Sequence, residues 1–455
     1  MVLKKVETGI TNNVHCIDDK KAGNPDSDPA WRGDFKGLID KLDYIKAMGF
    51  TAIWITPVFE NGSSYDFHGY HAINFSKVDP RYESEGATYQ DLINACHNKG
   101  IKVIQDIVLN HTSNNGEENL FPIMSKQNVL THGVPQVSPP YYTWKETKDY
   151  GWNYNSTDGK DNIELCKQAY ADGGNSNNQR TSDNAFLNGN EYHTPDYSEN
   201  SGLAVIDYAM HFNFEYAQKA FNIGKEEDKY MNDSTWNVTY VDSHDYGPSI
   251  NGNDENRYAG GTDAWAENLD LMFTFRGIPC VYYGSEVEFQ AGQKADKGNT
   301  APLSTTGRAY FGDFIEGSVD VTDFSEYSNA TGTMAQTLNS PLSKHIQRLN
   351  KIRKAIPALR RGQYSTEGVS GSGMAFKRRY TADGVDSFVC VAISGSATFT
   401  GIPSGTYVDA ITGKTVQCNG TLTTDSVGKG NMRVYVLQNS SGISGKIGED
   451  GAYLK

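Results

Sequence analysis

Apolar residues first recur at regular intervals after Trp31. In the stretch FKGLIDKLDYIKAM the leucines, isoleucines and methionine are spaced as on one face of an α-helix, and Gly49 follows as a helix stop. The next stretch, TAIWITPV (residues 51–58), is short, apolar and rich in β-branched residues, which is typical of a strand buried on both faces. A helix followed by a buried strand indicates the repeating unit of a parallel sheet.

The same unit recurs along the chain. ATYQDLINACHNKG (87–100) has a helical pattern with a glycine stop, and KVIQDIVLNH (102–111) is another apolar strand that ends in polar residues. WNVTYVDSHD (236–245) ends in the same way, the helical stretch AWAENLDLMFTFRG follows, and IPCVYYGSE (278–286) closes with a carboxylate. Several buried strands with polar ends predict an α/β fold, a (β/α)8 barrel of the TIM type whose site lies at the C-terminal strand ends.

Two segments depart from this rhythm. Residues 112–200 are rich in Asn, Gly, Tyr and Ser, and a structureless loop of that length is uncommon, so they predict an inserted subdomain. Toward the C-terminus, alternating stretches such as SFVCVAI and MRVYVLQ are separated by glycine-containing turns, which predicts an all-β sandwich. We therefore expect the barrel in residues 1–111 and 201–364, the inserted domain in 112–200 and the β-sandwich domain in 365–455.

Composition limits the classes of function. The net charge of −14 argues against a nucleic-acid partner, and no window approaches the roughly 20 apolar residues of a membrane span. The six cysteines include no CxxC pair, so a zinc site is not expected, and Cys280 and Cys390 lie in apolar runs that suit small buried thiols. The N-terminal stretch lacks the apolar core of a signal peptide, which leaves an intracellular chain, a mature secreted form and an engineered form open.

Polar and aromatic side chains gather where the predicted strands end. These candidates are Asp106, Asn110 and His111 at one strand, Asp242, His244 and Asp245 at another, Glu286 at a third, and His68 and Tyr70 after the strand at 51–58. Each alone fits a hydrogen-bonded loop anchor. Together, carboxylates and imidazoles that converge at C-terminal strand ends are how barrel enzymes build a site.

These stretches resemble the motifs of the α-amylase family of glycoside hydrolases. In the order of the family they are GFTAIWITPV at the second strand, DIVLNH at the third, TPDYSEN late in the insertion that follows the third strand, YVDSHD at the seventh and GIPCVYYGSE at the eighth. The resemblance runs from Gly49 to Glu286, and an amylase-type β-sandwich follows.

The resemblance implies a role for each candidate. His244 and Asp245 are expected to bind hydroxyls of the sugar at the cleavage position, where Asp245 stabilises an oxocarbenium-like transition state, and Asp106 is expected to organise the catalytic site. Hydroxyls need charged or amide partners, while the C–H face of a sugar prefers an aromatic platform, so these residue types fit a glucan. The other expected substrate-binding residues are His68, His111 and Tyr70, the last of which would stack under the ring.

The resemblance also implies calcium. Asn110 matches a family calcium ligand at the third strand, and Asp196 in TPDYSEN matches a second ligand from the insertion. Oxygen donors from these two segments suit a hard cation such as Ca²⁺, which would tie them together. A weaker second site is the acidic stretch GNPDSDP, with Asn24, Asp26 and Asp28, although these residue types also form turns.

One part of the family pattern is missing. A retaining glycosidase needs two carboxyl groups about 5 to 5.5 Å apart, a nucleophile and a general acid. In the family the nucleophilic Asp ends the fourth strand in a Gly-Phe-Arg-x-Asp pattern and the acid Glu ends the fifth, and this chain contains neither pattern. In the family, TPDYSEN precedes the fourth unit, and AVIDYAMHFNF resembles the sixth strand. The fourth and fifth barrel units are therefore expected to be absent. The first strand is a second departure, because it lacks a clear apolar run.

Asp207 is the alternative nucleophile, because His211 follows at the family's spacing. However, Val205 stands where the family has Arg, and the 37 positions from Asp207 to His244 cannot hold two further units of about 30 residues each. If the stretch is a strand, Glu215 lies about 26 Å further along at ~3.3 Å per residue, too far to be the acid. Neither residue is expected to be catalytic.

The sequence therefore favours an endo-acting hydrolase of α-1,4-glucosidic bonds in starch-like α-glucans, with a retaining mechanism and with its two catalytic carboxylates in segments missing from the printed chain. Omission is preferred to a rebuilt fold, because a barrel without two adjacent strands would have unpaired edges. The alternative is a non-catalytic α-glucan-binding relic, and a related specificity such as neopullulanase or transglycosylase stays open. A monomer without a nucleic-acid or membrane partner is expected, secreted and in its mature form.

Overall fold

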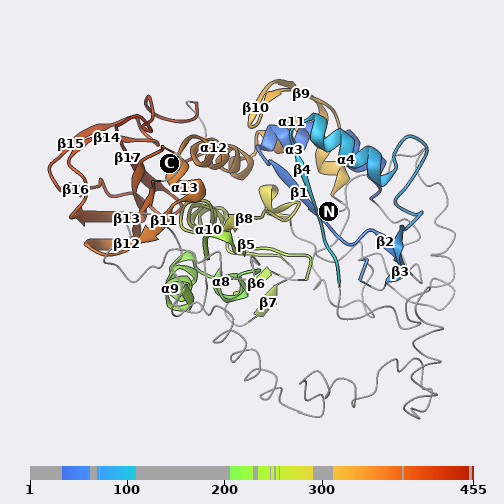
Figure 1. Ribbon diagram of the computed structural model, residues 1–455, viewed down its shortest axis with the longest axis horizontal. Helices are drawn as coiled ribbons and strands as arrows, with labels where there is room; N and C mark the ends of the chain where they lie inside the picture. The colour runs from blue at the N-terminus through green and yellow to red at the C-terminus, as the bar shows by residue number, and fades with distance from the viewer. Residues whose placement is uncertain are drawn as a thin grey trace, which may run out of the picture. The chain divides into compact units, whose positions relative to one another are not determined.

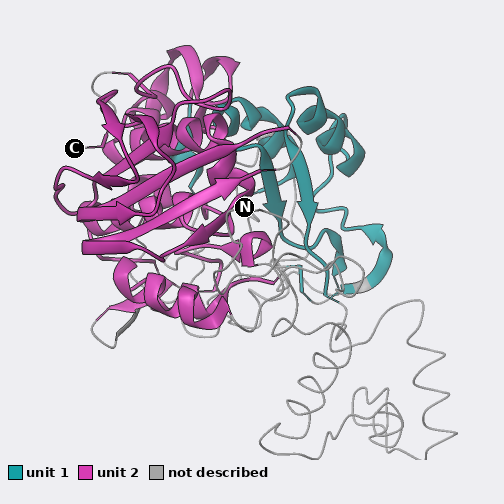
Figure 2. Ribbon diagram, turned by 60° about the vertical axis from the view of Figure 1, so that its left-hand side comes forward, with its two compact units in different colours: residues 1–46, 50–169, 297–316 teal, residues 47–49, 170–296, 317–455 magenta. Residues whose placement is uncertain are grey.

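The computed structural model describes two compact units, which are coloured separately in Figure 2. The first comprises residues 1–46, 50–169 and 297–316, and the second comprises 47–49, 170–296 and 317–455. Within them, the residues whose structure is described are 33–61, 69–70, 72–108, 205–228, 234–245, 247–250, 253–255, 257–289, 311–381, 384–449 and 453–454. The predicted domain boundaries, including the inserted domain at 112–200, stay predictions, and that insertion lies outside the described residues.

The first unit begins with the predicted helical stretch, which forms two short helices, α2 (Phe35–Asp40) and α3 (Leu42–Met48). Asp34 caps α2 by accepting a hydrogen bond from the backbone N–H of Gly37 at 2.7 Å. The helices are separated at Lys41, whose Nζ donates to the carbonyl oxygen of Ile315 at 2.7 Å, beside the short 3-10 helix η6 (Gly312–Ile315). The helical pattern is thus confirmed, with one break.

A parallel strand pair follows, as predicted, and a helix lies between the two strands in chain order (Figure 1). β1 (Ala52–Ile55) pairs with β4 (Lys102–Gln105), and α4 (Tyr89–Asn98) connects them after the antiparallel pair β2 (Phe59–Asn61) and β3 (Ala72–Val78). Thr88 and Asp91 form a capping box at the start of α4. These elements form a β-α-β unit.

The predicted burial of these strands is partly wrong. Ile53 and Ile55 of β1 are buried, whereas Ala52 and Trp54 on its other face are only half-buried. On and just after β4, Ile104 is 51% exposed and Ile107 is 49% exposed. The reason is that β1 is the only strand paired with β4 among the described residues, so β4 has one free edge in this part of the chain.

The second unit contains the remaining barrel elements that the structure describes. Ile206 forms a parallel bridge with Val238 of β5 (Val238–Thr239), and β5 pairs in parallel with β8 (Ile278–Pro279). These strands are shorter than predicted, and the carboxylate that was expected to end the last of them belongs to the 3-10 helix η4 (Ser285–Val287). The other elements of this region are η3 (Ser234–Trp236), α9 (Ala217–Glu227), α10 (Thr262–Thr274) and the hairpin β6 (Gly247–Ile250) and β7 (Asn253–Glu255).

The stretch AVIDYAMHFNF is not a strand beyond its first residues. After the single bridge at Ile206 the chain turns into helix α8 (Tyr208–Asn213), because Asp207 caps the helix by accepting from the backbone N–H of Met210 at 3.0 Å. The strand spacing used to place Glu215 is therefore wrong. Its side chain instead pairs with Lys219 at 2.9 Å, one helical turn along the chain.

The C-terminal strands confirm the predicted all-β pattern. Six strands follow the order β11-β12-β13-β17-β14-β15 in one sheet, β16 pairs with β13, and all these pairs are antiparallel. Their buried faces share a core that includes Phe388, Phe399 and Tyr435. The strands are β11 (Gln363–Ser365), β12 (Val369–Tyr380), β13 (Ser387–Thr400), β14 (Gly405–Asp409), β15 (Thr415–Cys418), β16 (Thr421–Thr423) and β17 (Met432–Leu437).

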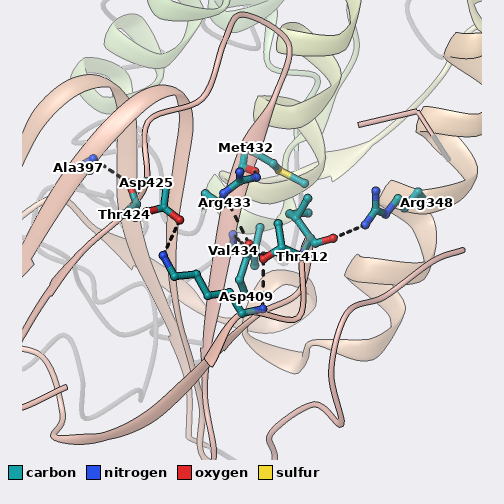
Figure 3. A network of polar contacts seen from close by, with 11 residues as sticks. Arg348, Ala397, Asp409, Thr412, Thr424, Asp425, Met432, Arg433 and Val434 are labelled. Atoms are coloured by element: carbon teal, nitrogen blue, oxygen red, sulfur yellow. Dashed lines mark hydrogen bonds and ion pairs between the residues drawn. The ribbon is translucent and has the colours of Figure 1, made fainter. Parts of the chain in front are cut away.

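Helices precede this sheet and are tied to it by polar contacts. They are α11 (Gly332–Leu338), α12 (Pro341–Ala355) and α13 (Pro357–Arg361), which follow the hairpin β9 (Val319–Asp323) and β10 (Glu326–Ala330). Arg348 of α12 donates to the carbonyl oxygen of Ile411 at 2.5 Å, and buried Asp409 accepts the backbone N–H groups of Ile411 and Val434 at 3.1 Å (Figure 3). The network joins α12 to the β14 end of the sheet.

Two predictions from composition can be compared with the structure for the described residues. Of the four cysteines described, all are free thiols; Cys390 is buried as predicted, whereas Cys280 is only half-buried. No helix in the described ranges is both long and apolar enough to cross a membrane.

Candidate functional site

One pair of predicted site residues lies in the first unit. Asp106 directly follows β4, and its backbone N–H donates to the carbonyl oxygen of Ile55 at 3.2 Å, which extends the strand pairing by one residue. The hydroxyl of Tyr70 donates to Oδ2 of Asp106 at 2.8 Å. Gly69 permits this approach: its φ is +81°, and an added Cβ would lie 2.2 Å from the carbonyl oxygen of Pro57. Asp106 thus holds the ring of Tyr70 beside the end of β4.

A second pair lies in the second unit, shortly after β5. Nε2 of His244 is 3.4 Å from Oδ1 of Asp245, and the side chains are 31% and 44% exposed. The backbone N–H of Asp245 donates to Oγ of Ser243 at 3.2 Å. A partly exposed imidazole beside a carboxylate offers both donors and acceptors to a hydroxyl-rich ligand.

Asp242 forms the buried base of this turn. Its Oδ1 accepts the backbone N–H of Tyr258 at 2.7 Å, its Oδ2 accepts the hydroxyl of Ser285 at 3.3 Å, and Nη1 of Arg257 lies 3.6 Å from Oδ2. Burial raises the pKa of Asp242, while the charge of Arg257 and the hydrogen bond from Tyr258 oppose that rise. Asp242 is thus an anchor for the turn, and the exposed groups above it are His244 and Asp245.

Helix α8 supports the same turn from a second side. The ring of His211 packs edge-on against Tyr240 with 4.6 Å between centroids, and His211 is hydrogen-bonded to the backbone of Tyr240 and Val241. Burial lowers the pKa of His211 to about 4, although these hydrogen bonds and the charge of Asp245 act in the opposite direction. Tyr208 adds a side-chain hydrogen bond to Tyr240, whose pKa is raised by burial. His211 is therefore neutral near pH 7 and acts as a hydrogen-bonding support.

The remaining predicted site residues lie outside the described part of the chain, and their roles stay predictions. They are His68, Asn110, His111, Asp196, Asn24, Asp26 and Asp28. Among the residues that the structure does describe, no group of three or more His, Cys, Asp or Glu side chains is placed to hold a metal ion.

Two carboxylates near these strands, Asp207 and Glu286, have structural surroundings. Asp207 is fully buried and pairs through Oδ2 with Nη1 of Arg276 at 2.5 Å. Glu286 is buried in η4, where its carbonyl oxygen accepts the hydroxyls of Ser340 and Ser343, each at 3.2 Å. Neither carboxylate stands on an accessible strand end, and the Arg276 pair agrees with the expectation that Asp207 is not a nucleophile.

Sequence reasoning missed Arg257. It follows Asp245 by twelve residues, beyond the hairpin β6–β7, and no spacing rule connects an arginine there to the strand end. The single signal in the sequence was the aromatic pair Tyr282 and Tyr283 in the eighth-strand motif, which forms part of the surroundings of Arg257.

Comparison with known proteins finds similarity to the same family as the motifs. Residues 21–162 match the family model described as the alpha amylase catalytic domain. The beta/alpha-amylase of Paenibacillus polymyxa is 27% identical over 403 residues, covering 78% of this chain and 30% of that protein. The cyclomaltodextrin glucanotransferase of Thermoanaerobacterium thermosulfurigenes is 24% identical over 505 residues, covering 91% of this chain and 64% of that protein. The chain thus spans less than two thirds of the length of either relative.

A solved structure shows the fold. The α-amylase of Geobacillus thermoleovorans, crystallised with acarbose, superposes with a TM-score of 0.52 at 19% identity, covering 90% of this chain and 93% of the other. The shared architecture is the (β/α) barrel with a C-terminal β domain. Together these matches confirm the family resemblance inferred from the motifs.

Proposed function

We propose, on the premise that the chain is a relative of the α-amylase family of glycoside hydrolases, that it belongs to an enzyme acting on starch-like α-glucans. The proposed reaction is endo-hydrolysis of α-1,4-glucosidic bonds with retention of configuration. The observation that carries the proposal is the partly exposed pair His244 and Asp245, held on the buried carboxylate of Asp242 at the end of a parallel strand.

The described side chains suit the binding steps of this reaction. Asp245 and His244 can accept and donate hydrogen bonds to neighbouring hydroxyls of one sugar ring, and Asp245 can stabilise positive charge that develops at the anomeric carbon. Tyr70, fixed through Asp106, offers an aromatic face to a ring. The acarbose bound in the Geobacillus amylase and the names of the sequence relatives support a glucan as the ligand class.

The nucleophile and the general acid are proposed to lie in two barrel units that the printed chain lacks. The match to the Thermoanaerobacterium enzyme extends over 505 aligned positions but takes in only 91% of 455 residues, which is about 414 residues. About 90 aligned positions thus carry no residue of this chain, which is ample for two units of ~30 residues or more each.

Exposed apolar side chains beside the expected position of those units support the same proposal. Ile104 and Ile107, at the end of β4, are about half exposed, and so is Val205, which precedes the bridge at Ile206. Apolar residues at the open edge of a parallel strand are normally covered by the next β-α unit. In the first unit that neighbour would be the fourth strand, and in the second unit it would be the fifth.

The alternative function is a glucan-binding relic that holds sugar but cannot cleave it. It is favoured if the chain is complete as printed, because Asp207 and Glu286, the carboxylates described near the strand ends besides Asp106, Asp242 and Asp245, are both buried. The intact mass of the purified protein decides between the two premises: a mass above 50.1 kDa indicates additional segments.

The function is tested by starch hydrolysis together with maltoheptaose binding. We expect reducing ends from starch if the two units are present, and binding without turnover if they are not. Asp245→Asn should weaken maltoheptaose binding roughly ten- to hundredfold, because a hydrogen bond to a charged group contributes about 1.5 to 3 kcal/mol.

A matched control for this variant is Asp425→Asn. Asp425 pairs with Lys414 at 2.7 Å on the C-terminal sheet, where both side chains are exposed. Its replacement should leave binding unchanged. If Asp245→Asn binds maltoheptaose as tightly as Asp425→Asn does, or if the wild-type protein binds no α-glucan, the proposed function is wrong.

Calcium binding is a further part of the proposal, with Asn110 and Asp196 as the ligands. A bound cation stabilises the folded state in proportion to its occupancy, so EGTA should lower the melting temperature and added CaCl2 should restore it, whereas MgCl2 should not. Asn110→Ala should abolish the response to EGTA. A melting temperature that is indifferent to EGTA contradicts the calcium site. Secretion and a monomeric state complete the proposal.

A further inference from the structure

Arg257 has unusual surroundings for a cation. Its side chain is fully buried, and its guanidinium carbon lies 4.1 Å from the ring centroid of Tyr282, 4.9 Å from that of Tyr283 and 5.4 Å from that of Phe289. All three rings follow β8. Aromatic faces attract a desolvated guanidinium electrostatically, so these rings replace part of the water that the charge loses on burial.

The guanidinium is aimed at the base of the candidate site. Nη1 lies 3.6 Å from Oδ2 of Asp242, and both side chains are almost completely buried. The residue next to Arg257, Tyr258, donates its backbone N–H to the other carboxylate oxygen at 2.7 Å. Asp242 is therefore held at both oxygens by one short segment, residues 257–258, and at Oδ2 also by Ser285.

The hairpin between Asp245 and Arg257 brings this segment back to the strand end. Gly247 pairs with Glu255 across the hairpin. A Cβ at Gly247 would lie 2.5 Å from the backbone nitrogen of Tyr258 and 2.7 Å from Oδ1 of Asp242, so the absence of a side chain allows this close packing. The chain leaves the site after Asp245, and after the hairpin residues 257–258 return to contact Asp242 in the same turn.

We propose that Arg257 is the positioning residue of His244 and Asp245: held among three aromatic rings, it fixes Asp242, and so fixes the turn that presents the two side chains to a sugar. Asp242 precedes His244 by two residues, so movement of its carboxylate is passed directly to the pair. That the bound ligand is a sugar rests on the proposed glucan function. The ordering of residues 240–245 by Arg257 does not depend on that function.

The chemistry requires arginine at this position. A lysine keeps the charge, but its ammonium group is compact, strongly hydrated and not planar. It therefore cannot stack on Tyr282 and reach Asp242 at the same time. The charge of Arg257 also counters the rise in the pKa of Asp242 that burial causes. Arg257→Lys therefore loosens the turn without removing a charge.

The test compares Arg257→Lys with Arg378→Lys. Arg378 is equally buried but belongs to β12, where it donates to the carbonyl oxygens of Leu359 at 2.7 Å, Thr274 at 3.2 Å and Gly362. Both variants are measured at the same interval below their own melting temperatures. Hydrogen exchange of the peptide that spans residues 240–245 should be roughly tenfold faster in Arg257→Lys and unchanged in Arg378→Lys, because only the first loses a local restraint.

Maltoheptaose binding supplies the second readout. We expect its dissociation constant to rise about tenfold in Arg257→Lys and to stay at the wild-type value in Arg378→Lys. If the wild-type protein binds no glucan, the proposed function fails and the exchange data alone decide the positioning role. Equal exchange of residues 240–245 in the two variants overturns the inference. Faster exchange with unchanged glucan affinity overturns its link to the site.

Discussion

Replacing Arg276 by methionine is expected to lower the free energy of unfolding by about 3 to 5 kcal/mol, the typical result of breaking a buried ion pair from one side. The Arg276 guanidinium is fully buried, with Nη1 2.5 Å from Asp207, Nε 2.9 Å from Asp228 and Nη2 donating to the carbonyl oxygen of Gly224 at 2.9 Å. Without it, the buried carboxylate of Asp207 loses its counter-ion, although it still accepts the backbone N–H of Met210. Urea unfolding at pH 7 measures the loss.

A matched control and a double variant separate the ion pair from general damage. Arg379 also binds a carboxylate through two nitrogens, at 2.8 Å to each oxygen of Asp386, but this pair is partly exposed. Arg379→Met should therefore cost about 1 kcal/mol or less. Adding Asp207→Asn to Arg276→Met should recover part of the loss, because the stranded charge is removed. Equal losses for Arg276→Met and Arg379→Met would contradict this account.

The Arg276 pair also shows why Asp207 is a structural residue. A carboxylate that caps α8, pairs with a buried guanidinium and has no exposed surface cannot attack a substrate. From the sequence, Val205 in place of the family's arginine and the short distance to His244 pointed to the same conclusion. The sequence could not show the actual partner, because Arg276 lies 69 positions away and reaches Asp207 only through the packing of α10 and its following turn.

Local signals predicted the helices and the C-terminal strands well. The capping box of Thr88 and Asp91 and the glycine after α4 act within one helical turn, so the sequence itself contains the interaction that starts or ends the element. The same holds for the long antiparallel pair β12 and β13, where alternating apolar residues face one core.

The errors arise where neighbours decide the outcome. β4 has the apolar composition of a buried strand, yet Ile104 is exposed because its open edge has no partner among the described residues. AVIDYAMHFNF has enough apolar residues for a strand or a helix, and the cap at Asp207 turns it into α8 after one bridge. At the candidate site, the motif identified Asp242, His244 and Asp245, but Arg257 is joined to them only by the return of the hairpin.

His211→Gln is expected to be less sensitive to acid than the wild-type protein. Between pH 6.5 and pH 4, titration of His211 should lower the free energy of unfolding of the wild-type protein by up to about 3 kcal/mol, and the variant should lack this decrease. Burial lowers the pKa of the His211 imidazole to about 4, whereas the unfolded chain has the ordinary value near 6.5. Within this window the unfolded state binds a proton that the folded state does not. This contribution to stability is therefore present above pH 6.5 and is lost as the pH falls.

The titration of Asp270 changes the free energy of unfolding in the opposite direction, so its effect must be measured separately from that of His211. Burial raises its pKa to about 6, although His345, 2.9 Å away, lowers it. The folded carboxyl keeps its proton above the pH at which the unfolded one loses it, so this contribution falls as the pH rises from about 4 to 6. Asp270→Asn should consequently steepen the acid-side loss, while His211→Gln should flatten it.

Urea unfolding at half-unit intervals from pH 4 to pH 8 measures both slopes. His97, an exposed histidine near the end of α4, gives the control variant His97→Gln, which should leave the curve of the wild-type protein unchanged. If His211→Gln retains the full acid-side loss, the imidazole is not held neutral by burial. α8 would then not support the turn at Tyr240 in the way that its packing indicates, and the ordering of His244 and Asp245 would depend on Asp242 and Arg257 alone.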